Sequence, residues 1–259
     1  MKKSKIAVLV AMVVVLAFSL AACGGSDKSS SDKTVYKVGT EPTFPPFDTT
    51  DEDQNIVGLD MDLIKAIGED QGCDVEFENL SFDGLIPALK AGNIDIVAAG
   101  MNKDDEDRQK EVDFSDSYYE SKLFVAVTED NTTIKSVEDL TPDMKVAAQT
   151  GTTGASKVQE LKDAGKIKEA VILDGLDTCM MKLINGDVSA VINDKPVTEA
   201  YMKKQPDKIK MVGEALNAEN YGFAVQKGNA ELVEKINNGL KNIKENGTYD
   251  KLVDEWFNK

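Results

Sequence analysis

Short strand patterns and helical patterns alternate along this chain from residue 35 to residue 259, and this alternation limits its fold more than any other feature. The strand candidates are short runs rich in β-branched or apolar residues, at 35–38, 75–78, 94–98, 123–127, 145–148, 190–192 and 222–225. Apolar residues recur at helical spacing at 61–71, 84–91, 155–162, 178–185, 198–204 and 230–246. Such alternation predicts an α/β fold.

Two polar segments, 117–121 and 217–221, each precede a β-rich run and enclose a block of about a hundred residues, which is near the usual size of one domain. We interpret them as chain crossings between two lobes. The first lobe is expected to comprise 35–116 plus 222–259, and the second, inserted lobe to comprise 122–216.

The N-terminus has the pattern of an export signal. Lysines near the start precede an uncharged run from Ile6 to Ala22, which is shorter than the roughly 20 apolar residues of a membrane span. Leu20-Ala21-Ala22-Cys23 resembles the lipobox of bacterial lipoproteins. We therefore expect a lipoprotein signal peptide at 1–22, lipidation of Cys23, and a polar, flexible tether at 23–34 that anchors the domain to the outer face of the cell membrane. The alternative is an ordinary secreted protein with a cysteine there by chance.

The charge balance argues against binding to nucleic acid or to anionic lipid headgroups. The formal net charge is −16, and removal of 1–22, which holds three lysines and no acidic residue, makes it −19. A surface this acidic repels phosphate. The chain has no histidine, and Cys73 and Cys179 lie about a hundred residues apart, so we expect neither a metal site nor a disulfide.

Arg108 is the only arginine in this lysine-rich chain. A guanidinium differs from an ammonium in its planar fork of donors, which holds a carboxylate through two parallel hydrogen bonds. Arg108 is therefore a candidate for binding a carboxylate, and the alternative is a stray surface arginine.

Six ordered motifs carry a resemblance that spans residues 35–259. They are Val38-Gly39-Thr40-Glu41 leading to Pro45-Pro46-Phe47, Gly58-Leu59-Asp60-Met61-Asp62-Leu63, Phe82-Asp83-Gly84-Leu85-Ile86-Pro87-Ala88-Leu89, Val112-Asp113-Phe114-Ser115, Gly151-Thr152-Thr153, and Asn246-Gly247-Thr248-Tyr249 with Trp256-Phe257. In these motifs the chain resembles the polar amino-acid-binding proteins of bacterial uptake transporters, extracellular solute-binding family 3. The resemblance implies a two-lobed, type II periplasmic-binding-protein-like fold with two hinge crossings and a ligand cleft between the lobes.

The resemblance also implies which residues hold the ligand carboxylate. Arg108 stands five residues before Asp113, as the family's carboxylate-binding arginine does, although the segment 100–108 is one residue longer than the common pattern. Thr152 and Thr153 precede a predicted helix whose N-terminal N–H groups would face an anion. The alternative for these threonines is helix capping alone. One carboxylate would thus bridge both lobes.

Asp194 matches the family's aspartate for the ligand ammonium, with the carbonyl of Gly100 and the side chain of Asn102 as expected partners from the first lobe. The alternative for Asp194, which precedes Lys195-Pro196, is turn chemistry.

Two phenylalanines match positions that flank the ligand side chain in the family, Phe44 and Phe82, of which Phe82 is expected in a loop. Core packing is the competing interpretation. Glu41 matches a position that reaches the outer end of the ligand side chain, with Gln149 and Asn193 tuning this end. A desolvated carboxylate at Glu41 disfavours acidic ligands and favours an amide or a cation, so we expect glutamine or a basic amino acid.

The function implied is the extracytoplasmic substrate-binding subunit of an ABC importer, a monomer that uses no cofactor and delivers a free L-amino acid to its permease. A dehydratase-like enzyme and a sensor domain on the same fold are the alternatives. The chain offers no histidine for acid–base chemistry and no nucleophile–base pair. Sensor domains of this type usually continue into a membrane helix, and this chain ends shortly after Trp256-Phe257.

Overall fold

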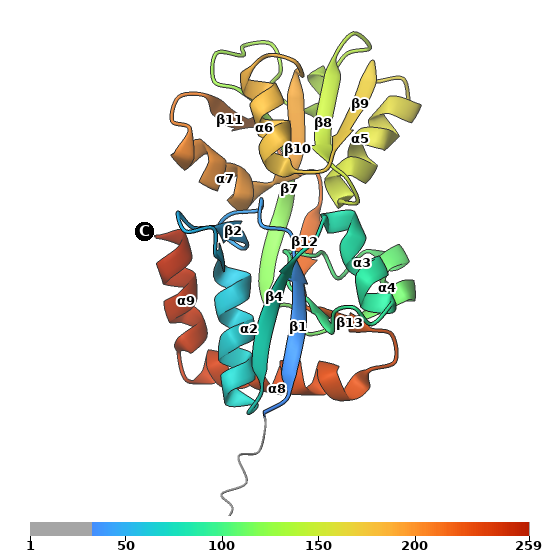
Figure 1. Cartoon of the computed structure of the whole chain (residues 1–259). Helices are drawn as coiled ribbons and strands as arrows, with labels where there is room; N and C mark the ends of the chain where they lie inside the picture. Colours follow the sequence, from blue (N-terminus) through green and yellow to red (C-terminus); the bar gives the residue numbers. More distant parts are fainter. Residues whose placement is uncertain (1–32, 259) are drawn as a thin grey trace, which may run out of the picture. The chain divides into compact units, whose positions relative to one another are not determined.

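The first lobe is built on a five-stranded sheet in the order β4-β1-β5-β13-β6. Its strands are β1 (Val35–Thr40), β4 (Asp74–Asn79), β5 (Ile96–Val97), β6 (Val112–Phe114) and β13 (Ala224–Gln226). β1 runs parallel to β4 and β5, whereas β13 is antiparallel to β5 and β6. The computed structural model describes residues 33–258, so the predicted signal peptide, Cys23 and all but the end of the tether lie outside the described residues (Figure 1).

Helices cover both faces of this sheet because alternate strand residues point to opposite sides. Ile96 and Val225 belong to the core formed with α2 (Leu59–Asp70) and α8 (Ala230–Glu245), against which α9 (Thr248–Phe257) also packs. Their neighbours Val97 and Ala224 point to the other face and pack against α3 (Phe82–Lys90). The lobe also contains the short helix α4 (Glu106–Glu111) and the hairpin of β2 (Thr49–Thr50) and β3 (Ile56–Val57).

The second lobe contains a sheet in the order β11-β7-β10-β8-β9. Its strands are β7 (Tyr119–Thr128), β8 (Lys145–Gln149), β9 (Glu169–Leu173), β10 (Ala190–Asp194) and β11 (Ile209–Val212). β8 is parallel to both β9 and β10. The helical segments are η1 (Val137–Asp139), α5 (Thr153–Asp163), α6 (Leu176–Ile184) and α7 (Lys195–Lys204).

The same alternation covers this second sheet on both sides. Ala190 and Ile192 of β10 share a core with Val158 of α5, whereas Val191 between them packs with Cys179 of α6. Cys179 is thus buried in the second lobe, and Cys73 is buried in the first, just before β4. The α/β fold with two lobes predicted from the sequence is confirmed.

The two segments expected as chain crossings form a strand pair. β12 (Ala218–Tyr221) lies antiparallel to the first residues of β7, and both run between the lobes in Figure 1. Because the two crossings lie side by side, each supplies the backbone partners that the other needs. Sequence patterns missed this pairing and also the strands β2, β3, β6, β9 and β11.

The carboxyl ends of parallel strands from both sheets meet where the lobes face each other. Glu41 follows β1, Phe82 follows β4 closely, and Gly100 follows β5. In the second lobe Gln149 ends β8 and Asp194 ends β10. Open α/β sheets place ligands at such edges. Within residues 33–258, no helix is both long and apolar enough to cross a membrane.

Gly58 is the N-cap residue of α2 and lies against the backbone of the loop that contains Phe47. Its φ is 145°, and a Cβ there would lie 2.0 Å from the carbonyl oxygen of Phe47. We expect Gly58→Ala to lower the free energy of unfolding by about 3 kcal/mol, since both the backbone and the loop must shift. Urea denaturation monitored by circular dichroism measures this change.

Gly72→Ala is the matched control. Gly72 also has a positive φ, 70°, but a Cβ added there would have no atom within 4 Å. It should cost only about 1 kcal/mol, the strain of the left-handed conformation. Equal losses in the two variants would contradict the steric argument.

Candidate functional site

Twelve residues from both lobes surround a small enclosed space of about 20 Å³, room for roughly one water molecule. All ten residues predicted to bind the ligand are among them. The lining residues are Glu41, Phe44, Phe82, Ala99, Gly100, Asn102, Arg108, Gln149, Thr152, Thr153, Asp194 and Glu219.

Arg108 reaches from the first lobe to the second. Asp105 caps α4 by accepting hydrogen bonds from the N–H groups of Asp107 and Arg108, which starts the helix that carries the guanidinium. Nη2 of Arg108 donates to the carbonyl oxygen of Gly151 in the second lobe at 2.9 Å, and Nη1 donates to that of Asn102 at 3.2 Å. With Arg108 only 9% exposed, burial lowers its pKa. The guanidinium is thus a desolvated charge held by neutral carbonyl groups and available to an anion.

Thr152 and Thr153 begin α5 opposite Arg108. Thr152 Oγ1 accepts from the N–H of Ala155 at 3.0 Å and donates to the carbonyl oxygen of Gln149 at 2.7 Å, so this hydroxyl caps the helix while its residue lines the pocket. The side chain of Thr153 instead hydrogen-bonds the carboxylate of Glu219. Both threonines therefore line the pocket from the N-terminus of α5, one as the helix cap and the other as a partner of Glu219.

Asp194 occupies the N-cap position of α7, but its side chain makes no capping hydrogen bond. Its Oδ1 instead accepts from Ser121 Oγ at 2.9 Å and from the hydroxyl of Tyr221, both on the hinge strands. Burial, followed by the charge of Glu219, raises the pKa of Asp194 to about 7. Turn chemistry alone does not account for a carboxylate that turns away from its own helix into a pocket.

Glu219 was not predicted from the sequence. It lies on β12, is 2% exposed, and accepts from the side-chain amide of Asn217 at 3.1 Å as well as from Thr153. Burial raises the pKa of Glu219, and Arg108 acts against that rise. Glu219 and Tyr221 are both buried and alternate with exposed or half-buried residues, which is strand periodicity inside a segment interpreted only as a crossing. Ala99, the other missed residue, carries no recognisable signal.

Glu41 and Gln149 join the lobes at the other end of the pocket. Gln149 Nε2 donates to Glu41 Oε2 at 2.8 Å, and Thr43 Oγ1 donates to the same oxygen at 2.8 Å. Burial raises the pKa of Glu41 despite these two donors. Asn193 does not line the pocket, and its amide donates to the carbonyl oxygen of Asp194 and to Thr198 Oγ1 instead.

Three pocket residues of the first lobe, Phe44, Gly100 and Asn102, are held by close contacts. Gly100 has a φ of 53°, and a Cβ there would lie 2.6 Å from Cε1 of Phe44, so the ring needs a glycine beside it. Asn102 Oδ1 accepts from the N–H of Asn220 at 3.2 Å, which ties this segment to the hinge.

The two phenylalanines differ in their surroundings. Phe44 is 8% exposed and belongs to the core as well as to the pocket. Phe82 is half-buried and is the first residue of α3, so its expected position in a loop is wrong by one residue. The guanidinium carbon of Arg108 lies 5.4 Å from the centre of the Phe82 ring, a cation–π distance.

The lobes are closed on each other in this structure. Besides the contacts of Arg108 and Gln149, the N–H of Leu176 donates to Thr43 Oγ1 at 3.2 Å, and the Tyr201 hydroxyl donates to the Thr43 carbonyl oxygen at 2.9 Å. The polar groups of the pocket thereby satisfy one another. A bound molecule larger than water must displace some of these contacts.

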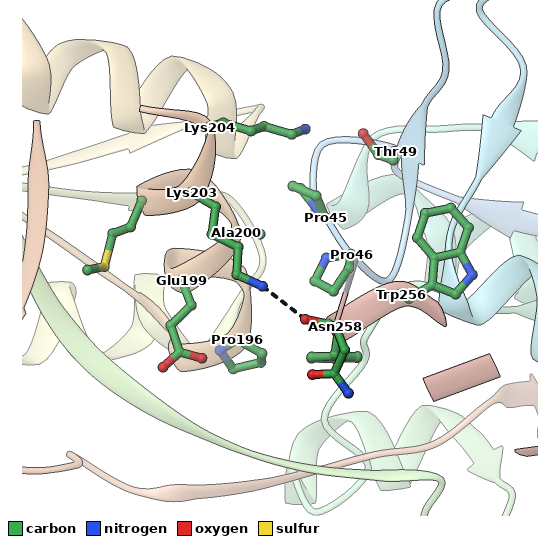
Figure 2. Close-up of a pocket in the computed structure, with 12 residues that line it drawn as sticks. Pro45, Pro46, Thr49, Pro196, Glu199, Ala200, Lys203, Lys204, Trp256 and Asn258 are labelled. Atoms are coloured by element: carbon green, nitrogen blue, oxygen red, sulfur yellow. Dashed lines mark hydrogen bonds between the residues drawn. The ribbon is translucent and has the colours of Figure 1, made fainter. Parts of the chain in front are cut away.

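A second, larger groove of about 780 Å³ lies between α7 and the first lobe (Figure 2). Its walls are mainly apolar, with Pro45, Pro46 and Trp256 on one side and Pro196 and Ala200 on the other. The bond from Lys203 Nζ to the carbonyl oxygen of Phe257, 2.9 Å, crosses it. It contains no buried charge, so we place the candidate site in the smaller pocket. In the part of the chain that the structure describes, no cluster of three or more histidine, cysteine or acidic side chains is placed to hold a metal ion.

Comparison with known proteins places this pocket in a family context. The model of the bacterial extracellular solute-binding proteins, family 3, matches residues 36–259. The chain is 34% identical to the ABC transporter arginine-binding protein 1 of Escherichia coli (strain K12), over 85% of this chain and 89% of that protein. It is 33% identical to the L-cystine-binding protein TcyA of Bacillus subtilis (strain 168), over 99% and 98%. A solved structure of an ancestral arginine-binding protein bound to arginine superposes with a TM-score of 0.82 at 44% identity, over 87% of this chain and 99% of that one.

The raised pKa values of the pocket carboxyl groups give a stability prediction for the ligand-free protein. Unfolded carboxyl groups release their protons near pH 4, whereas folded Asp194 holds its proton until about pH 7, so the free energy of unfolding should fall as pH rises from 5 to 8. Asp194→Asn removes this titration and keeps the oxygen that accepts from Ser121 and Tyr221. We expect the variant to be more stable than wild type at pH 8 by on the order of 1 kcal/mol.

Urea denaturation at pH 5, 6.5 and 8 tests this, with the exposed Asp130→Asn as control. The control should keep the wild-type slope of stability against pH. An Asp194→Asn slope equal to that of wild type would contradict the prediction.

Proposed function

The chain belongs to the bacterial extracellular solute-binding proteins, family 3, and from this premise we propose that it is the substrate-binding subunit of an ABC importer for a cationic amino acid. The type II periplasmic-binding-protein-like fold and the named relatives, which bind amino acids, support this function. The pocket residues supply the specificity argument.

The observation that carries the ligand class is the charge balance of the pocket. Three buried carboxyl groups, on Glu41, Asp194 and Glu219, accompany one guanidinium, that of Arg108. Burial raises the pKa of all three carboxyl groups in the empty pocket, so each needs a nearby cation to ionise fully. A zwitterionic amino acid with a neutral side chain adds no net charge to this excess of carboxyl groups. A ligand with a cationic side chain offsets one more of them in a site that excludes water, where opposite charges attract strongly. Arginine, lysine and histidine in its charged form therefore fit better than glutamine, and acidic ligands fit worst.

Each group of the ligand has a proposed partner. The carboxylate is bound by Arg108 and by the N-terminus of α5 at Thr153, so that it bridges both lobes. The ammonium is bound by Asp194, Gly100 and Asn102. Contacts from both lobes exist only in the closed arrangement, and the ligand accordingly stabilises closure.

The remaining pocket residues hold the ligand side chain. We place its aliphatic part between Phe44 and Phe82 and its charged end against Glu41 and Gln149. Thr152 caps α5 and lines the pocket without a charge of its own.

The proposal extends to the lobe boundaries, the lipid anchor and the permease. The lobes comprise 35–116 plus 222–259 and 122–216, with hinges at 117–121 and 217–221. Cys23 carries the lipid that anchors the protein outside the cell membrane after removal of 1–22, and the protein acts as a monomer with its permease. We propose binding without catalysis, since the chain has no histidine and the named relatives are binding proteins.

A thermal-shift panel tests the ligand class. Ligand that binds only the folded state raises the melting temperature by mass action. Among the twenty amino acids, cystine and ornithine, we expect the largest rises with arginine, lysine or histidine and none with glutamate. The largest rise with glutamate or cystine would overturn the charge argument but not the binding function, and no rise in folded protein free of bound ligand would overturn both.

Glu41→Gln tests the proposed contact with the ligand's charged end. The amide keeps an oxygen for Thr43 and Gln149 but loses the charge, so arginine should bind about tenfold more weakly, because a hydrogen bond between charged groups becomes one to a neutral group. Glutamine affinity should change much less. Isothermal titration calorimetry measures both, with the exposed Glu52→Gln as control. Equal losses for arginine and glutamine would place Glu41 away from the side-chain charge.

A further inference from the structure

Two carboxyl groups lie buried directly behind the pocket, and each has one satisfied and one unsatisfied oxygen. Asp48 and Asp60 are both fully buried. Asp48 Oδ2 accepts from Thr40 Oγ1 at 2.9 Å, and Asp60 Oδ2 accepts from the N–H of Gly100 at 2.8 Å and from the Tyr118 hydroxyl at 2.7 Å. The Oδ1 atoms of Asp48 and Asp60 are the only buried side-chain polar atoms, within residues 33–258, that have no hydrogen-bond partner.

The surroundings provide no positive charge for these carboxyl groups. Neither Asp48 nor Asp60 forms an ion pair with a described lysine or arginine, and each lies within electrostatic range of the other. The other ionisable side chains within electrostatic range of the pair are one carboxyl group and three tyrosines, of which Tyr118 is in hydrogen-bond contact with Asp60: Glu41, Tyr118, Tyr201 and Tyr249. Burial raises the pKa of Asp48 well above its usual value, as does the charge of Asp60, and burial raises the pKa of Asp60 to about 7.

Two adjacent carboxylates without a counter-ion are strongly unfavourable in a dry core, and so is a buried oxygen without a donor. One proton between the two orphan oxygens relieves both costs, since it removes one charge and supplies the missing hydrogen bond. We propose that Asp48 and Asp60 share a single proton between their Oδ1 atoms, and that this acid–carboxylate pair positions Phe44 and Gly100 for ligand binding.

The two aspartates are connected to the pocket through short paths. The carboxyl group of Asp60 accepts a hydrogen bond from the N–H of Gly100, a pocket residue in the left-handed conformation with a φ of 53°. The backbone of Asp48 exchanges two hydrogen bonds, of 3.0 and 3.2 Å, with that of Phe44, so a shift of the Asp48 carboxyl group strains the turn that carries Phe44. Because the ring of Phe44 lies against Gly100, the two aspartates adjoin two neighbouring pocket segments. Both aspartates act through these residues and touch no ligand.

The protonation of the pair is measured without any ligand, by NMR of the protein carrying ¹³Cγ-labelled aspartate. The Asn variants assign the two signals. We expect the two carbons to titrate together and to retain one proton between them at pH 7. Two carboxyl groups that are both ionised at pH 7, with midpoints near the ordinary aspartate value, would overturn the proposal, as would two that are both protonated.

Asparagine variants test the geometry. In Asp48→Asn the amide oxygen accepts from Thr40 and the amide N–H₂ donates to Asp60, and Asp60→Asn works in reverse. Each single variant replaces the shared proton with a fixed donor. In the double variant two N–H₂ groups face each other with no acceptor, so its loss should exceed the product of the single losses by about tenfold.

Arginine affinity from pH 5 to 9 provides the functional readout, which rests on the proposed function, whereas the NMR titration does not. Wild-type affinity should fall more steeply at the high end than the affinity of Asp48→Asn, because the wild-type pair loses its proton there and two charges repel. Both proteins share any change that comes from the ligand's own ammonium group or from Asp194. The exposed Asp53→Asn should follow wild type. A double variant whose loss is the product of the single losses, or an equally steep fall in Asp48→Asn and wild type, would overturn the proposal. Failure of every variant and of wild type to bind arginine, with one proton still found by NMR, would contradict only the proposed ligand.

Discussion

The closed arrangement depends on buried charges that neither lobe satisfies by itself. Arg108 belongs to the first lobe, but its guanidinium reaches a carbonyl of the second, and the carboxylate of Glu41 is met by an amide from the second. Buried polar groups without partners cost several kcal/mol, whereas in an open cleft water satisfies them. In this structure the two lobes satisfy these groups across their boundary, through the bonds from Arg108 to Gly151 and from Gln149 to Glu41.

The hinge contributes to the site as well as joining the lobes. β7 and β12 pair side by side, and from them Ser121, Glu219 and Tyr221 reach into the charge network around Asp194. On the same two strands, the rings of Tyr119 and Tyr221 pack against Phe47, with ring centroids 4.9 and 5.0 Å from that of Phe47. The strands that connect the lobes therefore also supply hydrogen-bond partners and charge to the pocket around Asp194.

Two buried residues behind the pocket contact residues that line it. Asp60 accepts from the N–H of Gly100, and the backbone of Asp48 is hydrogen-bonded to that of Phe44, both within the first lobe. A carboxyl group in such a place is unfavourable for folding. The unsatisfied oxygens are understandable if the pair contributes to the precision of the pocket, since a rigid, hydrogen-bonded support limits how far the binding groups stray.

The sequence by itself determined the α/β class and the two-lobed division, because strand and helix periods and polar connecting segments are local properties. The pocket-lining residues came from the resemblance of the chain to a known family. Arg108 stood out by composition alone, and Thr152 by its place before a helix. Only the tertiary structure decided what depends on distant segments meeting. Glu219 joined the pocket because β12 pairs with β7, Asn193 turned away because of its register on β10, and Asp48 met Asp60 through the fold of the first lobe. Such contacts arise from packing between segments far apart in the chain, and no local pattern records them.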